Sequence, residues 1–284
     1  MKINKQCLPC LMNQVVKIAK MTDCLEQDEL FHQVFHYMSQ VDFHKTNPEI
    51  IGEVFALVKD YLHCEDPYYQ IRYDYNQLFL KQLSQIEQQI DSFEQAVLYA
   101  IVGNVIDFSP IHQNVQKDMM TYFQNMDQLS LTINHVERLK EDLMNASSLV
   151  YLGDNCGEIC LDLLLIKRIK AMNPQLKIYF VTRGKPVVND SILEDAYEVG
   201  MDQYATIISN GDGSLGTILS RVSQEFLDVY HQADLIIAKG QANFESLSEE
   251  DKNIYFLLMV KCDVISRYIG VKQKSFVCLS QKMR

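Results

Sequence analysis

The sequence predicts an α/β protein with a Rossmann-like, mainly parallel sheet and an N-terminal all-helical region packed on it. Up to about residue 145, glycines are few and apolar residues recur at three- and four-residue intervals, as in amphipathic helices. After residue 148, short β-branched or aromatic runs alternate with helical segments, which is typical of repeated strand-helix units. We therefore predict two domains, a helical N-terminal region over residues 1–145 and a Rossmann-like α/β domain over residues 146–284.

Three segments indicate the helices of the N-terminal region. Asn47-Pro48-Glu49 is typical of a helix start, because a capping residue precedes a proline at the first helical position, and an apolar face follows over residues 50–58. A second apolar stripe runs over residues 79–90. Ser92 and Gln95 have the spacing of a capping box before an apolar helix that reaches Gly103.

Five short apolar runs are the predicted strands of the second domain. They are Leu149–Leu152, Ile178–Thr182, Ala205–Ser209, Leu235–Ala238 and Phe276–Leu279. The segments that begin at Glu158, Ser191, Ser214 and Glu249 are predicted to be helical. No low-complexity linker separates the two domains, so we expect the boundary near residue 145 to be a change of structural class and not a flexible hinge.

The composition narrows the possible partners. A chain of 284 residues with 48% apolar content can bury a substantial core. The net charge of −11 argues against a nucleic-acid backbone or an anionic membrane as partner, because both favour a basic surface. The N-terminus lacks the apolar core of a signal peptide, and the eight cysteines are mostly dispersed. We therefore expect a soluble cytoplasmic protein with reduced thiols; its oligomeric state is left open.

The first predicted strand ends abruptly in Gly153-Asp154-Asn155. Taken alone, this turn is most simply a helix cap. In an open α/β sheet, however, ligands bind beyond the carboxyl ends of the strands. Asp154 would repel a phosphate group unless a cation lay between them, so the turn points to a divalent metal.

Polar residues also follow the next three predicted strands, and four neighbouring strand ends would converge on one crevice. Asp154, Asn155 and Asp190 are hard oxygen ligands suited to Mg²⁺, Mn²⁺ or a similar ion. The candidate phosphate or substrate contacts are Arg183, Gly213, Ser214, Thr217 and Lys239. Each of these has an ordinary alternative as a turn, a surface ion pair or a solvated loop end, and only their recurrence at successive strand ends favours a site.

Two further features stand apart from the strand ends. Asn104 and Asp107 follow an apolar helix, where they either form part of its C-terminal cap or face the crevice. Cys7-Leu8-Pro9-Cys10 has the spacing of half a zinc site or of a redox pair, and inert thiols are an equal alternative.

Four motifs together resemble one known family. They are Gly153-Asp154-Asn155-x-Gly157-Glu158, Arg183-Gly184-x-Pro186-x-x-Asn189-Asp190, Lys239-Gly240-x-x-Asn243-Phe244-Glu245 and, upstream, Gly103-Asn104-x-Ile106-Asp107. This set resembles the damage-control phosphatases, long catalogued as domain of unknown function 89. Cys7-x-x-Cys10 resembles the short prokaryotic subfamily of that family. The resemblance extends over almost the whole chain in the expected order.

The resemblance implies a divalent-metal-dependent phosphatase that acts on small phosphorylated metabolites, with Mg²⁺, Mn²⁺, Co²⁺ or Ni²⁺ as cofactor. In that family, the residues matching Asp154, Asn155 and Asp190 hold the metal, and the residue matching Lys239 is associated with the substrate phosphate. Further motif positions match Glu158, Asn104 and Asn243.

Metal-assisted phosphomonoester hydrolysis is therefore the expected reaction. Glu158 or another carboxylate would orient the attacking water, and covalent attack by Asp154 or Asp190 stays open. One rival is a nucleotide- or S-adenosylmethionine-binding transferase, although the first turn lacks Gly-x-Gly-x-x-Gly. The other rival is a non-catalytic thiol or metal-binding module built on Cys7 and Cys10.

Overall fold

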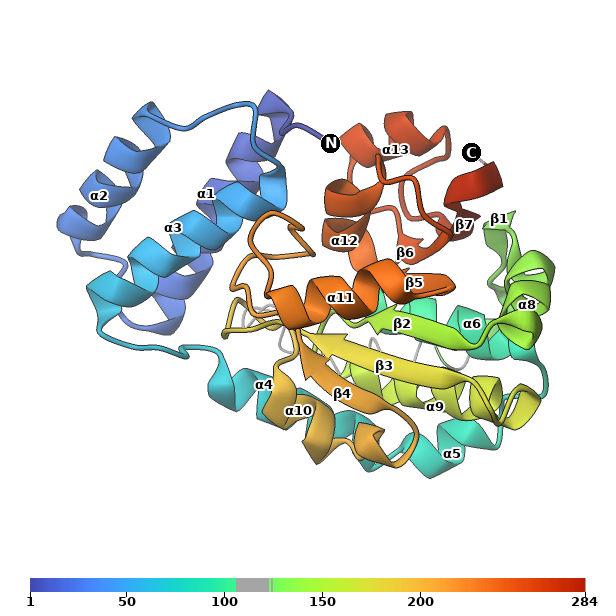
Figure 1. Cartoon of the computed structure of the whole chain (residues 1–284). Helices are drawn as coiled ribbons and strands as arrows, with labels where there is room; N and C mark the ends of the chain where they lie inside the picture. Colours follow the sequence, from blue (N-terminus) through green and yellow to red (C-terminus); the bar gives the residue numbers. More distant parts are fainter. Residues whose placement is uncertain (106–122, 124, 284) are drawn as a thin grey trace.

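The computed structural model describes residues 1–105, 123 and 125–283, and its centre is a seven-stranded sheet (Figure 1). The strands lie in the order β1-β7-β6-β5-β2-β3-β4. Every neighbouring pair is parallel except β6 and β7, so the predicted mainly parallel sheet is confirmed. The strands are β1 (Leu131–Asn134), β2 (Ser148–Leu152), β3 (Lys177–Thr182), β4 (Thr206–Ser209), β5 (Leu235–Lys239), β6 (Ile254–Met259) and β7 (Phe276–Ser280).

Helices cover both faces of this sheet and form a separate group at the N-terminus (Figure 1). The N-terminal group consists of α1 (Leu8–Met21), α2 (Asp28–Ser39) and α3 (Asn47–Leu62), preceded by the short helix η1 (Lys5–Cys7). The other helices are α4 (Tyr69–Leu80), α5 (Leu83–Glu87), α6 (Phe93–Val102), α8 (Val136–Asn145), α9 (Glu158–Met172), α10 (Leu193–Glu198), α11 (Gln224–Gln232), α12 (Gly240–Leu247) and α13 (Asp263–Ile269).

Alternation along the strands produces two apolar cores. Leu149 and Tyr151 of β2 point to the face covered by α6, α8 and α9. Val150 and Leu152 point to the opposite face, which is covered by α11, α12 and α13. This period of two places every second residue of a buried strand in each core, so β2 is apolar on both sides.

The N-terminal helices have an apolar core of their own, to which α1, α2 and α3 contribute. The cap of α3 differs from the prediction by one residue. Thr46 is the N-cap, since its hydroxyl accepts from the Glu49 amide, and the Glu49 carboxylate accepts from the Thr46 amide in turn. Ser92 is confirmed as the N-cap of α6, with its hydroxyl accepting from Gln95 N.

Three predictions of secondary structure need correction. Strand β1 lies inside the region predicted to be all helical, because its four residues pair with β7 through backbone hydrogen bonds. The segment from Glu249 contains strand β6, and its apolar run over residues 254–260 fits a fully buried strand. No helix begins at Ser214 among the described residues, and the next helix is α11. The division of the chain at residue 145 into two domains stays a prediction.

Among the described residues, no helix combines the length and apolar character needed to cross a membrane.

Candidate functional site

The carboxyl ends of four adjacent strands bring the predicted motifs together. Strands β5, β2, β3 and β4 are neighbours and run in parallel, so their following loops lie at one edge of the sheet. The loops after β2 and β3 are joined directly. Cys156 N donates to Asn189 O at 2.9 Å, and Ser191 N donates to Asp154 O at 2.8 Å. These bonds hold the two acidic loops in fixed register.

Arg183 lies between the two predicted metal-binding carboxylates. Its Nε donates to Asp190 Oδ2 at 2.7 Å, and its Nη2 donates to Asp154 Oδ1 at 3.2 Å. All three side chains are nearly or completely buried. The guanidinium therefore fixes the orientation of both carboxylates and engages one oxygen of each.

Two amide side chains bind the carboxylates of Asp154 and Glu158. Asn104 Nδ2 donates to Asp154 Oδ2 and Glu158 Oε2, at 2.8 Å in both cases. Asn155 Nδ2 donates to the same two oxygens at 3.0 and 2.9 Å. Because the Asn155 amide nitrogen is held by these acceptors, its Oδ1 is the atom left to bind a cation.

Lys239 is fully enclosed beneath this layer. Its ammonium donates to Ala100 O at 2.7 Å, Glu158 Oε1 at 2.8 Å and Asp162 Oδ1 at 2.5 Å. Three acceptors satisfy all three N–H groups of an ammonium. Its predicted contact with phosphate stays a prediction, and its observed contacts position Glu158. Asp162, one helical turn after Glu158 on α9, is a site residue that the sequence analysis missed.

The buried cluster has more negative than positive charge. Asp154, Glu158, Asp162 and Asp190 are four carboxylates, whereas Arg183 and Lys239 are the two cations paired with them. With all groups ionised, two negative charges are uncompensated.

Burial and neighbouring charges shift the pKa values of the clustered carboxyl groups in different directions. Burial, together with the charges of Asp190 and Glu158, raises the pKa of Asp154 well above its ordinary value, although Arg183 opposes the rise. Burial also raises the pKa of Asp190, against the effect of Arg183. Burial acts to raise the pKa of Glu158 as well, but Lys239 outweighs it and the pKa is lowered. Burial raises the pKa of Asp162 as well, to about 6, against the effect of Lys239. Ionisation is therefore disfavoured at three of the four carboxyl groups, and these include both predicted metal-binding aspartates.

Hard oxygen ligands and two surplus negative charges fit a divalent cation. Among the described residues, no group of three or more His, Cys, Asp or Glu side chains is arranged as a metal site. The predicted ligand set has two carboxylates and an amide as its third member, and it stays a prediction.

Gly240 provides the space that Asp154 occupies. Its φ of +76° is a conformation that favours glycine, and a Cβ added there would lie 1.9 Å from Asp154 Oδ2 and 3.1 Å from Asn104 Nδ2. Any larger residue would therefore displace the carboxylate.

A cavity of about 510 Å³ opens over the predicted metal ligands. Asp154, Asn155 and Asp190 line it on the sheet side. The remaining lining residues come from η1, α1, α3, α12, the end of β6, α13 and several loops: Gln6, Cys7, Cys10, Gln14, Asn47, Pro48, Val188, Asn189, Leu215, Gln241, Ala242, Glu245, Met259, Lys261, Cys262 and Val264.

Lys261 is the one cationic side chain among these lining residues, and the sequence analysis missed it. Its positive charge lowers the pKa of both Asp154 and Asp190, against the larger effect of their burial. Lys261 follows the end of β6, which pairs in parallel with β5. The available signal was the apolar run over residues 254–260, which we had predicted to lie in a helix.

The predicted phosphate contacts Gly213, Ser214 and Thr217, in the loop after β4, do not line the cavity. Ser214 is buried against α3, where a Cβ on Gly52 would lie 2.8 Å from its Cα. Thr217 Oγ1 donates to Asn243 Oδ1 at 2.9 Å, and Asn243 Nδ2 donates to Lys239 O at 2.8 Å. These side chains therefore connect the loops, and Leu215 is the residue of this loop that reaches the cavity wall.

The predicted contacts at Gly213 and Asn104 are placed similarly. Gly213 packs near Lys185, whose Cβ would lie 3.2 Å from an added Cβ. Asn104 is buried beneath the carboxylates. Ile106 and Asp107 of the upstream motif lie outside the described residues.

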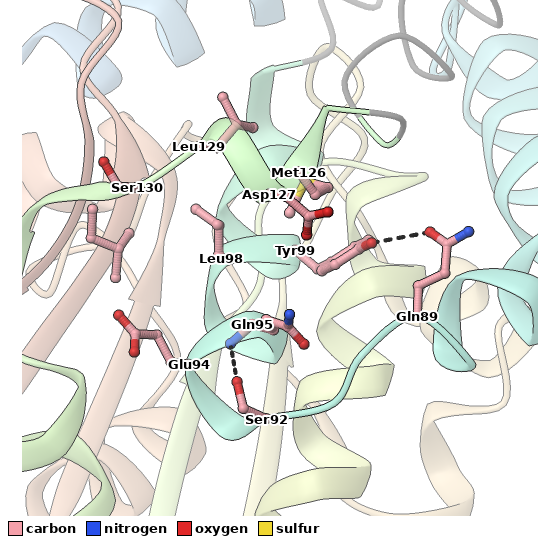
Figure 2. Close-up of a pocket in the computed structure, with 11 residues that line it drawn as sticks. Gln89, Ser92, Glu94, Gln95, Leu98, Tyr99, Met126, Asp127, Leu129 and Ser130 are labelled. Atoms are coloured by element: carbon pink, nitrogen blue, oxygen red, sulfur yellow. Dashed lines mark hydrogen bonds between the residues drawn. The ribbon is translucent and has the colours of Figure 1, made fainter.

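A second pocket, of about 270 Å³, lies near the N-terminal end of α6 (Figure 2). Figure 2 shows the hydroxyl of Tyr99 facing Gln89, at 3.1 Å from its Oε1, and the Ser92 cap of α6. None of the predicted site residues lines it. The first cavity is therefore the candidate functional site.

Comparison with known proteins shows the relationship of the whole chain. A family model described as "Damage-control phosphatase ARMT1-like domain" matches residues 3–277. The chain belongs to this family. Its membership confirms the resemblance of the motifs and supports a phosphatase activity in metabolite repair.

Individual members of the damage-control phosphatase family match over nearly their full lengths. A damage-control phosphatase of Pyrococcus horikoshii is 31% identical, with 100% of both chains covered. One from Archaeoglobus fulgidus is 33% identical and covers 95% of this chain and 96% of its own. The crystal structure of a family protein (domain of unknown function 89) from P. horikoshii superposes with a TM-score of 0.90, at 29% identity and 99% coverage of each chain.

Proposed function

We propose that this chain is a divalent-metal-dependent phosphomonoester hydrolase that acts on small phosphorylated metabolites. The observation that carries the proposal is the buried cluster of four carboxylates and two cations at the floor of the cavity. Two uncompensated charges in a buried site are costly, and a divalent cation would compensate them.

In this proposal, Asp154, Asn155 and Asp190 hold the cation, and all three line the cavity. When bound, a divalent cation stabilises the negative charge that develops on a transferring phosphoryl group. Arg183 keeps the two carboxylates in place, because it binds one oxygen of each.

Glu158 and Lys239 are proposed to act through the ligands. Both Glu158 oxygens accept hydrogen bonds, from Lys239 on one side and from Asn104 and Asn155 on the other. A fully buried carboxylate with these partners positions the Asn155 amide. In place of our prediction from sequence, we propose that Glu158 is a positioning residue and not the group that orients water.

Lys261 is the proposed contact for the substrate phosphate. Once a cation neutralises the cluster, an incoming phosphate dianion needs a further positive charge, and Arg183 and Lys239 are already paired with carboxylates. Lys261 lines the same cavity and lies nearer to solvent. The cavity volume of about 510 Å³ suits a small metabolite.

We also propose that the protein acts in the cytoplasm, with a small metabolite and no nucleic acid as its partner. All eight cysteines are free thiols, which fits a reducing compartment. The net charge of −11 is unfavourable for binding a nucleic-acid backbone.

The test is phosphate release from a panel of phosphorylated metabolites in the presence of Mg²⁺, Mn²⁺, Co²⁺ or Ni²⁺. We expect release that stops when the metal is chelated, and a loss on the order of 100-fold in Asp190→Asn, because that change removes a ligand charge without changing side-chain shape. Lys261→Ala should raise KM about tenfold, as expected for the loss of one charge-assisted hydrogen bond.

Lys185→Ala is the matched control for Lys261→Ala. Lys185 follows β3 at the same edge of the sheet, is exposed and does not line the cavity, so its removal should leave KM unchanged. Absence of phosphate release with every metal and metabolite would refute the proposed function. Equal effects of the two lysine substitutions would refute the role of Lys261.

A further inference from the structure

Three thiols lie in the wall of the candidate active-site cavity, and the proposed hydrolysis uses none of them. Cys7 and Cys10 come from η1 and the first turn of α1, and Cys262 comes from the loop after β6. They share this cavity with Asp154, Asn155 and Asp190. A covalent change in these thiols would therefore change the wall of the cavity that holds the substrate.

The helical backbone brings Cys7 and Cys10 close to each other. Cys7 has φ −79° and ψ −18°, Leu8 has φ −56° and ψ −42°, and α1 continues from there. Residues three apart in such a turn have Cα atoms about 5 Å apart. That spacing falls inside the range of Cα separations that a disulfide spans.

The two thiols differ in exposure, so they are expected to react in a fixed order. Cys10 is exposed, whereas Cys7 is half-buried. Burial, with a further contribution from the nearby Glu245 carboxylate, raises the pKa of Cys7 to about 11. Cys10 is therefore the thiol that meets an external reagent first, and Cys7 is the thiol beside it that closes the ring.

A metal site is the competing use of these thiols, and the geometry does not favour it. Throughout residues 1–105 and 125–283, no three His, Cys, Asp or Glu side chains are grouped as metal ligands. A structural zinc site needs four ligands around one point. Two thiols one helical turn apart have the Cα separation of a disulfide but supply only half of a zinc site.

We propose that Cys7 and Cys10 form a reversible disulfide in the wall of the active-site cavity, and that this bond weakens substrate binding. The effect on substrate rests on the proposed function, whereas formation of the bond does not.

The chemistry is thiol-disulfide exchange with a low-molecular-weight disulfide, R–S–S–R. The Cys10 thiolate attacks one sulfur, which forms a mixed disulfide and releases R–S⁻. The Cys7 thiolate then attacks Cys10 Sγ, which forms the Cys7–Cys10 bond and releases a second R–S⁻. The two cysteines lose two electrons and two protons, and the reagent is reduced to two R–SH molecules.

The expected consequence concerns substrate and not metal. The bond draws the two sulfur atoms to about 2.05 Å and fixes the face of α1 that lines the cavity, which includes Gln14 one turn further on. The metal ligands belong to the loops after β2 and β3, and they are joined to each other by backbone hydrogen bonds. Affinity for the metal should therefore be the same in both redox states.

The experiment treats the full chain with oxidised glutathione and then maps the thiols by alkylation and mass spectrometry. We expect one peptide to carry both Cys7 and Cys10, to lose the mass of two hydrogen atoms and to resist alkylation until a reductant is added. Cys64 is an internal control, because it is exposed and has no neighbouring cysteine in the sequence. It should form only a mixed disulfide with glutathione.

Two variants separate this pair from the third thiol. Cys262→Ser should still form the internal bond, whereas Cys7→Ser should stop at a mixed disulfide on Cys10. Unchanged alkylation of Cys7 and Cys10 after treatment, or a bond from Cys7 to Cys262, would overturn the proposal.

The effect on the cavity is read by calorimetric binding of inorganic phosphate to the metal-loaded chain, and by the KM for a phosphate ester. Oxidation should weaken phosphate binding severalfold and raise KM by a similar factor, reversibly in the wild type and not at all in Cys7→Ser. If the disulfide forms without changing phosphate binding, the proposed effect of the bond on substrate binding is refuted. If the disulfide forms and alters phosphate binding while no ester is hydrolysed in either redox state, the proposed function fails and this inference stands.

Discussion

Arg183 shows how far single residues could be interpreted from the sequence. Its position after the second predicted strand correctly placed it beside Asp190, since both residues flank the same loop. Its expected contact with phosphate stays a prediction, and the structure shows its guanidinium bound to two carboxylates. Sequence order indicates which residues reach a strand end, but the direction of each side chain depends on neighbours from other segments.

Lys239 and Lys261 also show that the sequence does not indicate which lysine is buried and which lines the cavity. Lys239 follows a predicted strand and was assigned to the substrate, yet it is enclosed by α6 and α9. Lys261 follows a strand that we had predicted to be helical, and it is the lysine that lines the cavity. The burial of each lysine is decided by packing against helices distant in sequence.

At Gly240, substitution by alanine should remove most of the activity. The added Cβ would meet Asp154 Oδ2 at 1.9 Å, so the carboxylate must move, and a misplacement of about 1 Å at an active site costs on the order of 100-fold in rate. The positive φ adds about 1–2 kcal/mol of destabilisation. Measurements of kcat/KM and of the free energy of unfolding by urea would test both effects.

Gly270→Ala is the matched control for this substitution. Gly270 has a φ of +85°, close to that of Gly240, but an added Cβ would meet no atom within 4 Å. Its substitution should cost a similar amount of stability and leave kcat/KM unchanged. Equal activity of the two variants would show that Gly240 contributes only its backbone conformation.

At the scale of elements, the long and regular patterns were the most predictable. All five predicted strands exist, and each has one predicted boundary that matches and one that differs by a single residue. Strands β1 and β6 were missed for different reasons. β1 has four residues at the edge of the sheet, and its pairing partner β7 lies more than a hundred residues later, so no local pattern marks it. β6 is apolar on both faces, and periodicity alone does not distinguish such a run from a buried helix.

The contact between α3 and the loop after β4 joins the N-terminal helices to the sheet domain. Gly52 faces Ser214 in this contact, and a Cβ at Gly52 would lie 2.8 Å from the Ser214 Cα. Because the obstructing atom belongs to the backbone, no rotation of a side chain relieves the overlap. The absence of a side chain at Gly52 therefore sets how closely α3 approaches the loop.

Gly52→Ala should consequently destabilise the protein by about 1–3 kcal/mol, as overpacking does. Helix propensity alone predicts the opposite sign, since alanine in a helix is favoured over glycine by about 1 kcal/mol. The sign of the change in the free energy of unfolding thus decides between the two effects. A stabilised variant would show that α3 does not pack closely on this loop.

At the scale of the whole molecule, the strand order explains why separate motifs form one site. The connections place β5, β2, β3 and β4 side by side in the parallel part of the sheet, although β5 is the last of the four in sequence. The sequence predicted this convergence, because parallel strands carry their carboxyl ends to one edge. It did not predict the charge balance of the cluster, since Asp162 lies within an apolar helix and is directed to Lys239 only by the packing of α9 on the sheet.

The central claim is that the buried cluster binds a divalent cation because two of its negative charges are uncompensated. The most direct measurement is calorimetric titration of the metal-free chain with Mn²⁺ and Mg²⁺. We expect one cation per chain, strongly weakened binding in Asp154→Asn and Asp190→Asn, and unchanged binding in the double variant Cys7→Ser/Cys10→Ser. Binding that survives both aspartate substitutions but disappears with the two cysteines would contradict the account.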